Sequence, residues 1–176
     1  MSKQSSSDAS SHQIRPLTSA DLEAVVDLSL LAWEPVFVSC ENILGTAIFD
    51  RLYRPEWRSA QATAVEEVCL AEAIESFVLV TAADDVAGFV ALRQENDSAT
   101  GVIEMIAVHP QHQRRGHARA LMEYAMQHLR NQGLALINVG TGGDPGHAPA
   151  RALYEEVGFT GVPVVNYYMA IETSHS

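Results

Sequence analysis

The sequence Val108-His109-Pro110-Gln111-His112-Gln113-Arg114-Arg115-Gly116-His117-Ala118-Arg119 joins an apolar run to an amphipathic one. The run that ends at Val108 predicts a strand. After Gly116, apolar residues recur at the spacing of a buried helical face: Ala118, Leu121, Met122, Ala125 and Leu129. The first N–H groups of a helix have no intrahelical acceptor and lie at the positive end of its dipole. We therefore predict a strand–loop–helix unit whose basic, glycine-containing loop binds a phosphate group.

Periodicity and turn signals divide the rest of the chain into strands and helices. Apolar runs predict strands over residues 13–17, 77–81, 86–93, 102–108, 134–139 and 162–171. The capping-box pattern Thr18-Ser19-Ala20-Asp21 predicts the start of a first helix. Further helices are predicted over about 42–53, from Pro55 in a first turn to about 71, from 117 to Gly133, and over 150–157. Strand–helix–strand after three meandering strands requires a parallel pair, so we expect a mixed, mostly antiparallel α/β sheet with helices on both faces.

Composition limits the class of protein. The 176 residues are 47% hydrophobic and contain no apolar run near the roughly 20 residues of a membrane span. The net charge of −11, with Lys3 as the only lysine, argues against a nucleic-acid partner, including charged transfer RNA. Two cysteines give no disulfide framework, which favours the cytoplasm. Residues 1–11 are serine-rich, and we expect a disordered tail there.

Acidic residues are concentrated in one region of the chain. They are Glu34, Glu41, Asp50, Glu56, Glu66, Glu67, Glu72 and Glu75. Such a region attracts cationic amines, although a solvated helical face is the better explanation for most of these residues.

Two motifs resemble those of a known family. Gln113-Arg114-Arg115-Gly116-His117-Ala118 resembles the Q/R-x-x-G-x-G/A signature of the GNAT superfamily of acetyl-CoA-dependent N-acetyltransferases. The stretch from Ala150 to Phe159, ARALYEEVGF, resembles the family's A-x-x-L-Y-E-x-x-G-F hallmark. The two occur in the family's order, with a helix and a strand between them. The resemblance implies a GNAT-like acyltransferase fold, in which parallel strands 4 and 5 splay apart.

The resemblance also implies a site for acetyl-CoA. The coenzyme diphosphate would lie over the loop before the helix, held mainly by backbone N–H groups. The implied contacts are Gln113, Arg114, Arg115, Gly116, His117, Ala118 and Arg119. Gly116 would let the backbone approach the phosphate oxygens. The backbone of strand residues Met105, Ile106, Ala107 and Val108 would hydrogen-bond the pantetheine arm.

Two residues are candidates for proton transfer. The resemblance implies that Tyr154 protonates the departing thiolate of coenzyme A. A core tyrosine with a satisfied hydroxyl is the structural alternative. Glu104 lies mid-strand, on the same side as Val102 and Ile106 by strict alternation. A carboxylate among apolar neighbours has a raised pKa suited to a general base, acting directly or through an ordered water, whereas a solvent-facing carboxylate is an equal alternative.

The glycine-rich loop over residues 140–147 fits neither a P-loop nor a dinucleotide-binding motif, because it lacks the required lysine and final glycine. We expect it to line the acceptor site, with Trp33, Asp144 and His147 as substrate contacts. Asp144 as a simple helix cap is the structural alternative. The histidines between 109 and 117 lack the spacing and companions of a metal site, so no metal is expected.

The sequence as a whole predicts an N-acetyltransferase, with residues 12–172 as its single domain. The acetyl group would pass from acetyl-CoA to a primary amine by direct attack, and the acceptor would be a small cationic molecule. A non-catalytic module that senses acyl-CoA and an enzyme that acetylates a protein or peptide amine are the alternatives. We expect no membrane partner and a monomer or a homodimer.

Overall fold

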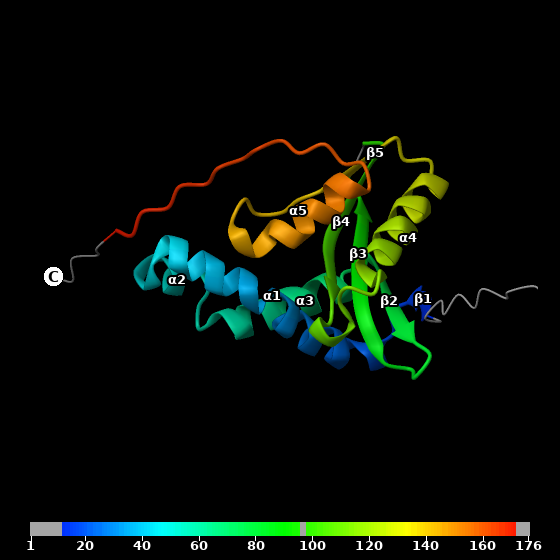
Figure 1. Cartoon of the computed structure of the whole chain (residues 1–176), viewed down its shortest axis with the longest axis horizontal. Coiled ribbons are helices and arrows are strands. Elements are labelled where there is room, and N and C mark those ends of the chain that lie inside the picture. The colour runs from blue at the N-terminus through cyan, green and yellow to red at the C-terminus, as the bar shows by residue number, and fades with distance from the viewer. Residues whose placement is uncertain (1–11, 96–97, 172–176) are drawn as a thin grey trace, which may run out of the picture.

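The computed structural model describes residues 12–95 and 98–171 (Figure 1). Its strands are β1 (His12–Pro16), β2 (Glu75–Thr81), β3 (Val86–Gln94), β4 (Thr100–Val108) and β5 (Leu136–Val139). Its α-helices are α1 (Leu22–Leu44), α2 (Thr46–Leu52), α3 (Trp57–Leu70), α4 (His117–Asn131) and α5 (Ala148–Glu156). Three short 3-10 helices, η1 (Ser19–Asp21), η2 (Pro110–His112) and η3 (Pro145–His147), connect them. The tail predicted over residues 1–11 lies outside the described residues.

The strands form one mixed sheet in the order β1-β2-β3-β4-β5. The first four strands pair antiparallel, and β4 pairs parallel with β5, as predicted. The β4–β5 pairing covers only residues 100–103 of β4. Beyond Ile103 the two strands separate, so the second half of β4 has a paired edge toward β3 and an open edge toward β5.

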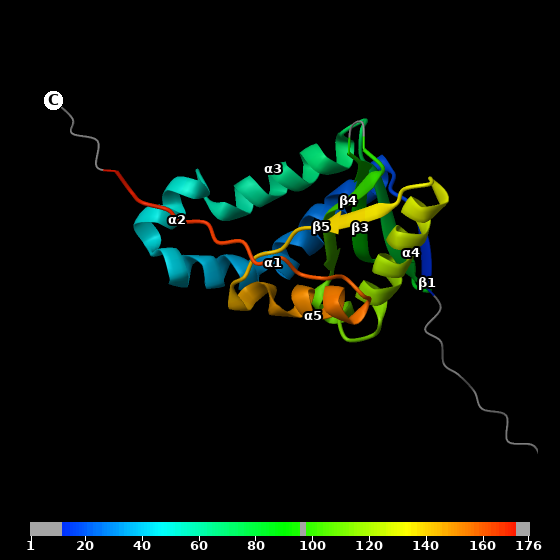
Figure 2. The same ribbon diagram turned by 90° about the horizontal axis from the view of Figure 1, so that it is seen from above.

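Helices cover both faces of the sheet, as the periodicity predicts (Figures 1 and 2). On one face, α4 and α5 pack over a core that includes Leu79, Leu92, Leu121 and Met122. On the other face, α1 and α3 pack over a second core around Phe89. The apolar stripe of α4 predicted from the sequence is buried.

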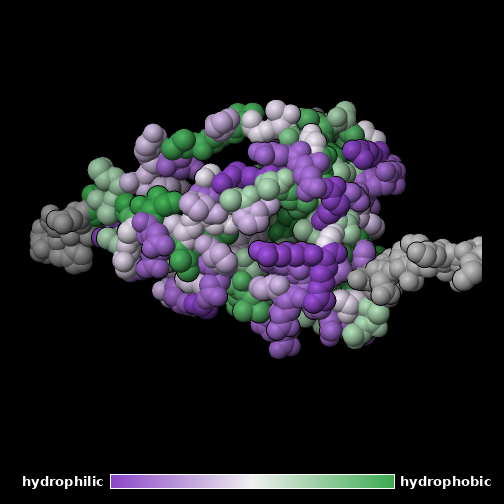
Figure 3. Space-filling model, in the orientation of Figure 1, coloured by the Kyte–Doolittle hydropathy of each residue, from purple (hydrophilic) through white to green (hydrophobic). Residues whose placement is uncertain are grey.

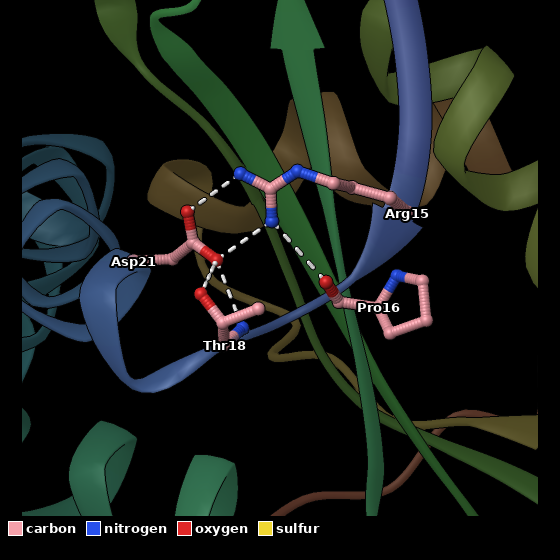
Figure 4. Close-up of polar contacts among 4 residues, drawn as sticks. All are labelled: Arg15, Pro16, Thr18 and Asp21. Carbon is pink, nitrogen blue, oxygen red and sulfur yellow. Dashed lines mark hydrogen bonds and ion pairs between the residues drawn. The ribbon is translucent and has the colours of Figure 1, made fainter.

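A partly buried ion pair fixes the connection from β1 to α1 (Figure 4). Both terminal nitrogens of Arg15 donate to the Asp21 carboxylate, at 2.7 and 2.8 Å. The backbone N–H and the hydroxyl of Thr18 donate to the same carboxylate, at 2.8 and 2.7 Å, which confirms the predicted capping box. The hydrogen bond from Arg15 holds the pKa of Asp21 well below its usual range, despite burial.

Two predicted helix boundaries are wrong. The first helix continues through Pro35 to Leu44 and ends at Gly45, so α2 begins at Thr46 rather than near residue 42. Proline removes a single hydrogen bond there, while the buried side chains of α1 hold the helix on the sheet. Pro55 lies outside the first turn of α3, because Glu56 is the N-cap and accepts from the Ser59 N–H.

The strand predicted over residues 162–171 is also wrong. Those residues form no strand in the described structure, and the segment runs from the end of α5 past α2 (Figures 1 and 2). Gly158, with φ of +101°, ends the preceding helix as predicted. The apolar side chains that suggested a strand are therefore exposed.

Candidate active site

The loop between β4 and α4 presents a row of unpaired backbone N–H groups. Arg114 and Gly116 have φ of +59° and +81°, which turns the backbone into the N-cap of α4. The N–H groups of residues 114–119 find no acceptor within the described part of the chain. No atom lies within 4 Å of where a Cβ on Gly116 would be. Open space beside a row of amides at a helix N-terminus fits a diphosphate.

Side chains brace this loop at both ends. Gln113 donates from Nε2 to the Val108 carbonyl at the end of β4, at 3.1 Å. Arg119 is paired with Glu123 one turn along α4 and with Glu156 at the end of α5. Because Arg119 already has two carboxylate partners, the charge available to a phosphate comes from Arg114 and Arg115, which form no ion pair among the described residues.

Glu104 lies where β4 and β5 part. The β3–β4 register shifts between Ala91 and Leu92, so Met105 and Ile103 have partners on β3 while Glu104 is the extra residue of a β-bulge. The bulge breaks strict alternation, and the predicted grouping of Glu104 with Ile106 is wrong. Ile106 packs on the α4 side of the sheet, and Met105 packs on the α1 side.

The surroundings of Glu104 also differ from the prediction. Its carboxylate forms an ion pair with Nε of Arg93 on β3 and is partly exposed, not enclosed by apolar neighbours. Arg93 was not singled out from the sequence, because only the bulged register places it beside Glu104. The ion pair keeps a carboxylate oriented at the opening between the strands.

Tyr154 lies in the middle of α5, where its side chain is 8% exposed and belongs to the core on the α4 side. Burial raises the pKa of its phenol to about 12. The hydroxyl therefore keeps its proton throughout the neutral range. The structure thus shows a core tyrosine whose protonation state also suits a general acid.

Asp144 and His147 form a pair in the loop after β5. Nδ1 of His147 is in hydrogen-bond contact with Oδ2 of Asp144, and the Gly146 N–H donates to Oδ1 at 2.9 Å. Desolvation raises the pKa of the Asp144 carboxyl, but hydrogen bonds from His147 and Ser39 outweigh it and lower that pKa. Asp144 therefore caps η3, as the structural alternative predicted, and its charged carboxylate also orients the imidazole of His147.

The same loop is held tightly against α1 and α5. Arg151 donates to the carbonyls of Gly142 and Asp144, the latter at 2.8 Å. A Cβ on Gly146 would lie 2.8 Å from the Pro35 carbonyl oxygen, so only glycine allows this approach to α1. Sequence reasoning missed the part played by Arg151, although it stands inside the second motif.

A cavity of about 400 Å³ adjoins this pair. It is lined by α1 and by the start of η3: Pro35, Val38, Ser39, Asn42, Ile43, Pro145 and Gly146. Trp33, two residues before Pro35 on α1, is half-buried, and its ring centroid lies 6.3 Å from that of Phe89 on the sheet. Of the predicted acceptor contacts, Asp144 and His147 thus flank a cavity, while Trp33 packs on the core.

The acidic residues between Glu34 and Glu75 are exposed, and most of them lie on α1, α2 and α3. Several have local partners, such as Glu34 with Arg58 at 2.6 Å and Glu75 with His128 at 3.0 Å. These contacts favour the interpretation of a solvated helical surface.

The histidines near the loop pack together without forming a metal site. The ring centroids of His109 and His112 are 5.7 Å apart, and those of His112 and His117 are 6.3 Å apart. Burial and the neighbouring His12, His112 and Arg115 lower the pKa of His117. Within residues 12–95 and 98–171, no group of three or more His, Cys, Asp or Glu is arranged to hold a metal ion.

The family model of the acetyltransferase (GNAT) family matches residues 36–159, which include the separated strands, the amide loop and Tyr154. The chain belongs to the GNAT acetyltransferase family. Members of this family are acetyltransferases that use acetyl-CoA. The GNAT loop in this chain has the features that a coenzyme diphosphate requires: unpaired amides, open space and two arginines free of ion pairs in the described region.

Relatives share this GNAT fold or part of the sequence. A mycothiol acetyltransferase from Beutenbergia cavernae is 43% identical over 72 residues, which cover 41% of this chain and 24% of that protein. The chain thus matches about a quarter of that relative's length. A ribosomal-protein-alanine N-acetyltransferase from Escherichia coli superposes with a TM-score of 0.62 at 23% identity, covering 87% of this chain and 80% of that one.

Two further structures show the same architecture. The PaiA N-acetyltransferase from Thermoplasma acidophilum, in complex with coenzyme A, has a TM-score of 0.63 at 14% identity, over 85% of this chain and 90% of that one. The aminoglycoside N-acetyltransferase AAC(6')-Iy, in complex with coenzyme A, has a TM-score of 0.57 at 20% identity, over 92% and 96%. These likenesses establish the fold. None of the described helices has both the length and the apolarity to cross a membrane.

Proposed function

We propose that this chain transfers the acetyl group of acetyl-CoA to a primary amine of a small cationic molecule, by direct attack of the amine. The observation that carries the proposal is the opening between β4 and β5. It lies beside the amide loop, with Glu104 at its apex. Residues 12–172 would act as one domain. The free, half-buried Cys40 and Cys69 favour a cytoplasmic setting.

The coenzyme would bind along β4 and across the start of α4. The open edge of β4 beyond Glu104, through Ile106, Ala107 and Val108, offers backbone groups to the amide-rich pantetheine arm. The amides of residues 114–119 would take the diphosphate. When bound, acetyl-CoA supplies an activated acetyl thioester. Backbone N–H groups of β4 would polarise its carbonyl.

Tyr154 would supply the proton that the leaving sulfur needs. Its phenol is protonated at neutral pH because burial raises the pKa to about 12. Because a thiol is more acidic than this phenol, proton transfer to a fully formed thiolate is uphill, so the phenol would donate its proton as charge develops on sulfur during cleavage of the carbon–sulfur bond. The resulting phenolate would then take a proton from solvent, and Glu104 would release the proton of the amine to solvent. The hydroxyl of Tyr154 would therefore contribute to the chemical step and not to the affinity for coenzyme A.

Glu104 would take the proton from the ammonium group of the acceptor, directly or through an ordered water. It stands at the bulge where the strands open, and Arg93 fixes its orientation. Deprotonation leaves the amine lone pair free to attack the acetyl carbon. The new carbon–nitrogen bond forms as the carbon–sulfur bond breaks.

The acceptor would enter beside α1 and η3. The cavity there combines apolar side chains with the hydroxyl of Ser39 and the amide of Asn42, a mixture that suits a small polar molecule. His147, held by Asp144, would contact the acceptor at the rim. Trp33 would support the cavity from the core side. The charge of Asp144 and the acidic surface of the helices favour a cationic acceptor.

A thiol-release assay over a panel of amines tests the proposal. Purified protein is incubated with acetyl-CoA and, in turn, polyamines, aminoglycosides, amino acids and peptides with free N-termini. We expect thiol release with at least one small cationic amine and little with the peptides. Release with the peptides alone would replace the proposed acceptor by a protein or peptide amine. Absence of release with every amine, despite coenzyme binding by calorimetry, would contradict the proposed reaction.

A further inference from the structure

A second cavity lies beside the loop that begins α4. It has a volume of about 320 Å³ and is formed by the start of β1, the turn between β2 and β3, η2 and the first residue of α4. It is distinct from the cavity beside α1 and η3. In Figure 3 hydrophilic residues gather where the loop between β4 and α4 reaches the surface. The polar residues that line the second cavity are His12, Thr81, Asp85, His112, Arg115 and His117.

Two imidazoles of this cavity have buried polar atoms without partners. His117 is only 4% exposed, and its Nδ1 forms no hydrogen bond with any described residue. The same holds for the buried Nδ1 of His112. The ring of His117 packs edge-on against that of His12, with centroids 5.3 Å apart. Because buried polar atoms in proteins nearly always have a hydrogen-bond partner, these two nitrogens point to a ligand in the cavity.

The charge of the cavity favours an anion. Arg115 carries a permanent positive charge and forms no ion pair among the described residues. Burial lowers the pKa of His117, and the neighbouring His12, His112 and Arg115 lower it further. The carboxylate of Asp85 lines the cavity but is exposed, and it does not contribute to that shift. An excess of positive charge around a buried imidazole attracts an anion and repels a metal ion.

The turn between β2 and β3 adds a hydroxyl group. Oγ of Thr81 accepts from the N–H groups of Ala83 and Asp85, at 3.2 and 3.3 Å. Because these bonds use its lone pairs, the hydroxyl can still donate its hydrogen to a ligand. A guanidinium, a hydroxyl and two imidazoles are together the kind of donors that phosphate oxygens bind.

We propose that this cavity binds a phosphate monoester, with Arg115 as its charged partner and Thr81, His112 and His117 as further hydrogen-bond donors. The backbone N–H groups of Arg115 and His117 belong to the row of amides at the start of α4, while their side chains line the cavity. The monoester would therefore lie immediately beside a diphosphate on that row. The exposed Asp85 would accept from a hydroxyl of the attached sugar.

Two molecules could supply the monoester. Coenzyme A carries one on the 3′ oxygen of its ribose, a single sugar away from the diphosphate, and the adjacency of the cavity to the amide row favours this source. In this form the inference rests on the proposed binding of the coenzyme. A separate phosphate monoester presents the same chemistry to the cavity.

Calorimetry with coenzyme A and 3′-dephospho-coenzyme A, which lacks only the monoester, tests the first source. We expect the wild type to bind coenzyme A about tenfold more tightly than the dephospho form. Arg115→Gln, and His112→Phe, which keeps the ring but removes its nitrogens, should each abolish most of this preference. Arg130→Gln, at the other end of α4, removes an exposed arginine of the same charge and should keep it.

Inorganic phosphate tests the second source. In protein saturated with 3′-dephospho-coenzyme A, phosphate should shift the ring resonances of His112 and His117, and Arg115→Gln should abolish the shift. The same shift in protein saturated with coenzyme A would assign the cavity to a separate monoester, whereas its absence there would assign it to the 3′-phosphate.

Equal affinity for the two coenzymes, together with no response to phosphate, would overturn the proposal and leave coenzyme binding intact. Failure of both coenzymes to bind would contradict the proposed function instead. In that case the response of His112 and His117 to inorganic phosphate alone decides whether the cavity binds a monoester.

Discussion

Arg93 and Glu104 form an ion pair across the β-bulge at which β4 leaves β5. The pair fixes a carboxylate at the mouth of the opening, which is the position a proton acceptor needs. A residue at the bulge is displaced from the regular ladder, and bulges are frequent beside active sites for this reason.

Replacing this carboxylate should impair the chemical step. We expect Glu104→Gln to lower kcat about 10²-fold, with the KM for the amine nearly unchanged, because glutamine keeps the shape but takes no proton. Steady-state kinetics with the best amine measures both constants. Glu123→Gln on α4 is the matched control. An unaffected kcat for Glu104→Gln would show that another group or water removes the proton.

His147 should affect binding of the acceptor more than the chemistry. We expect His147→Gln to raise the KM for the amine about tenfold and to leave kcat within about threefold. Asp144→Asn should have the same effect, because the imidazole loses the carboxylate that orients it. If His147→Gln instead lowers kcat with an unchanged KM, the histidine, and not Glu104, is the proton acceptor.

Removing the phenol of Tyr154 tests its role as the acid. We expect Tyr154→Phe to lower kcat about 10²-fold, with the Kd for coenzyme A unchanged. The raised pKa of about 12 also means that the wild-type rate shows no loss from phenol ionisation up to about pH 9. Tyr124→Phe on α4 is a control for loss of a partly buried hydroxyl. Equal rates for Tyr154→Phe and the wild type would leave Tyr154 as a core residue only.

Two glycines at the ends of α4 allow a matched test of whether the amides of residues 114–119 bind the diphosphate. Gly116 at the start and Gly133 beyond the end have φ of +81° and +80°, and at neither would an added Cβ meet another atom within 4 Å. Each alanine variant should lose about 1 kcal/mol of folding free energy from backbone strain. Only Gly116→Ala should weaken coenzyme A binding, at least tenfold by calorimetry. Equal coenzyme affinity in the two variants would place the diphosphate elsewhere.

The Arg15–Asp21 pair makes stability depend on pH. Because the pKa of Asp21 is lowered on folding, its contribution is complete above the unfolded value near 4 and is lost as the pH falls below it. We expect Asp21→Asn to cost about 2 kcal/mol at pH 7, with partial exposure of Arg15 limiting the effect. Urea unfolding should show that the difference in unfolding free energy between the wild type and Asp21→Asn is smaller by about 1 kcal/mol at pH 3 than at pH 7. The exposed Asp27→Asn should show neither change.

Local patterns predicted most of the fold. The stripe of α4, the capping box at Thr18 and the glycine that ends α5 each depend on neighbours in sequence, so they could be found without the structure. The parallel β4–β5 pair followed from the order of elements. Packing of α1 on the sheet, which carries that helix through Pro35, depends on distant residues and could not be read from local signals.

The candidate site was predictable only in part. The motifs located the amide loop and Tyr154, but a one-residue shift in the β3–β4 register decides where Glu104 points and which residue pairs with it. The partner of His147 was near in sequence, whereas Ser39 comes from a helix far along the chain. The segment 162–171 has the apolar pattern of a strand but forms no strand in the described structure, because a periodic pattern does not show whether a strand edge is available to pair with it.

A titration of isotope-labelled protein with coenzyme A, followed by amide chemical shifts, locates the diphosphate and the pantetheine arm on the protein. We predict that the largest shifts fall on the amides of residues 114–119 and of Met105 to Val108, where unpaired N–H groups and an open strand edge meet. The amides of α3 (Trp57–Leu70), which packs on the opposite face of the sheet from α4, should remain unchanged. Saturable binding that leaves residues 105–108 and 114–119 unperturbed would contradict the account.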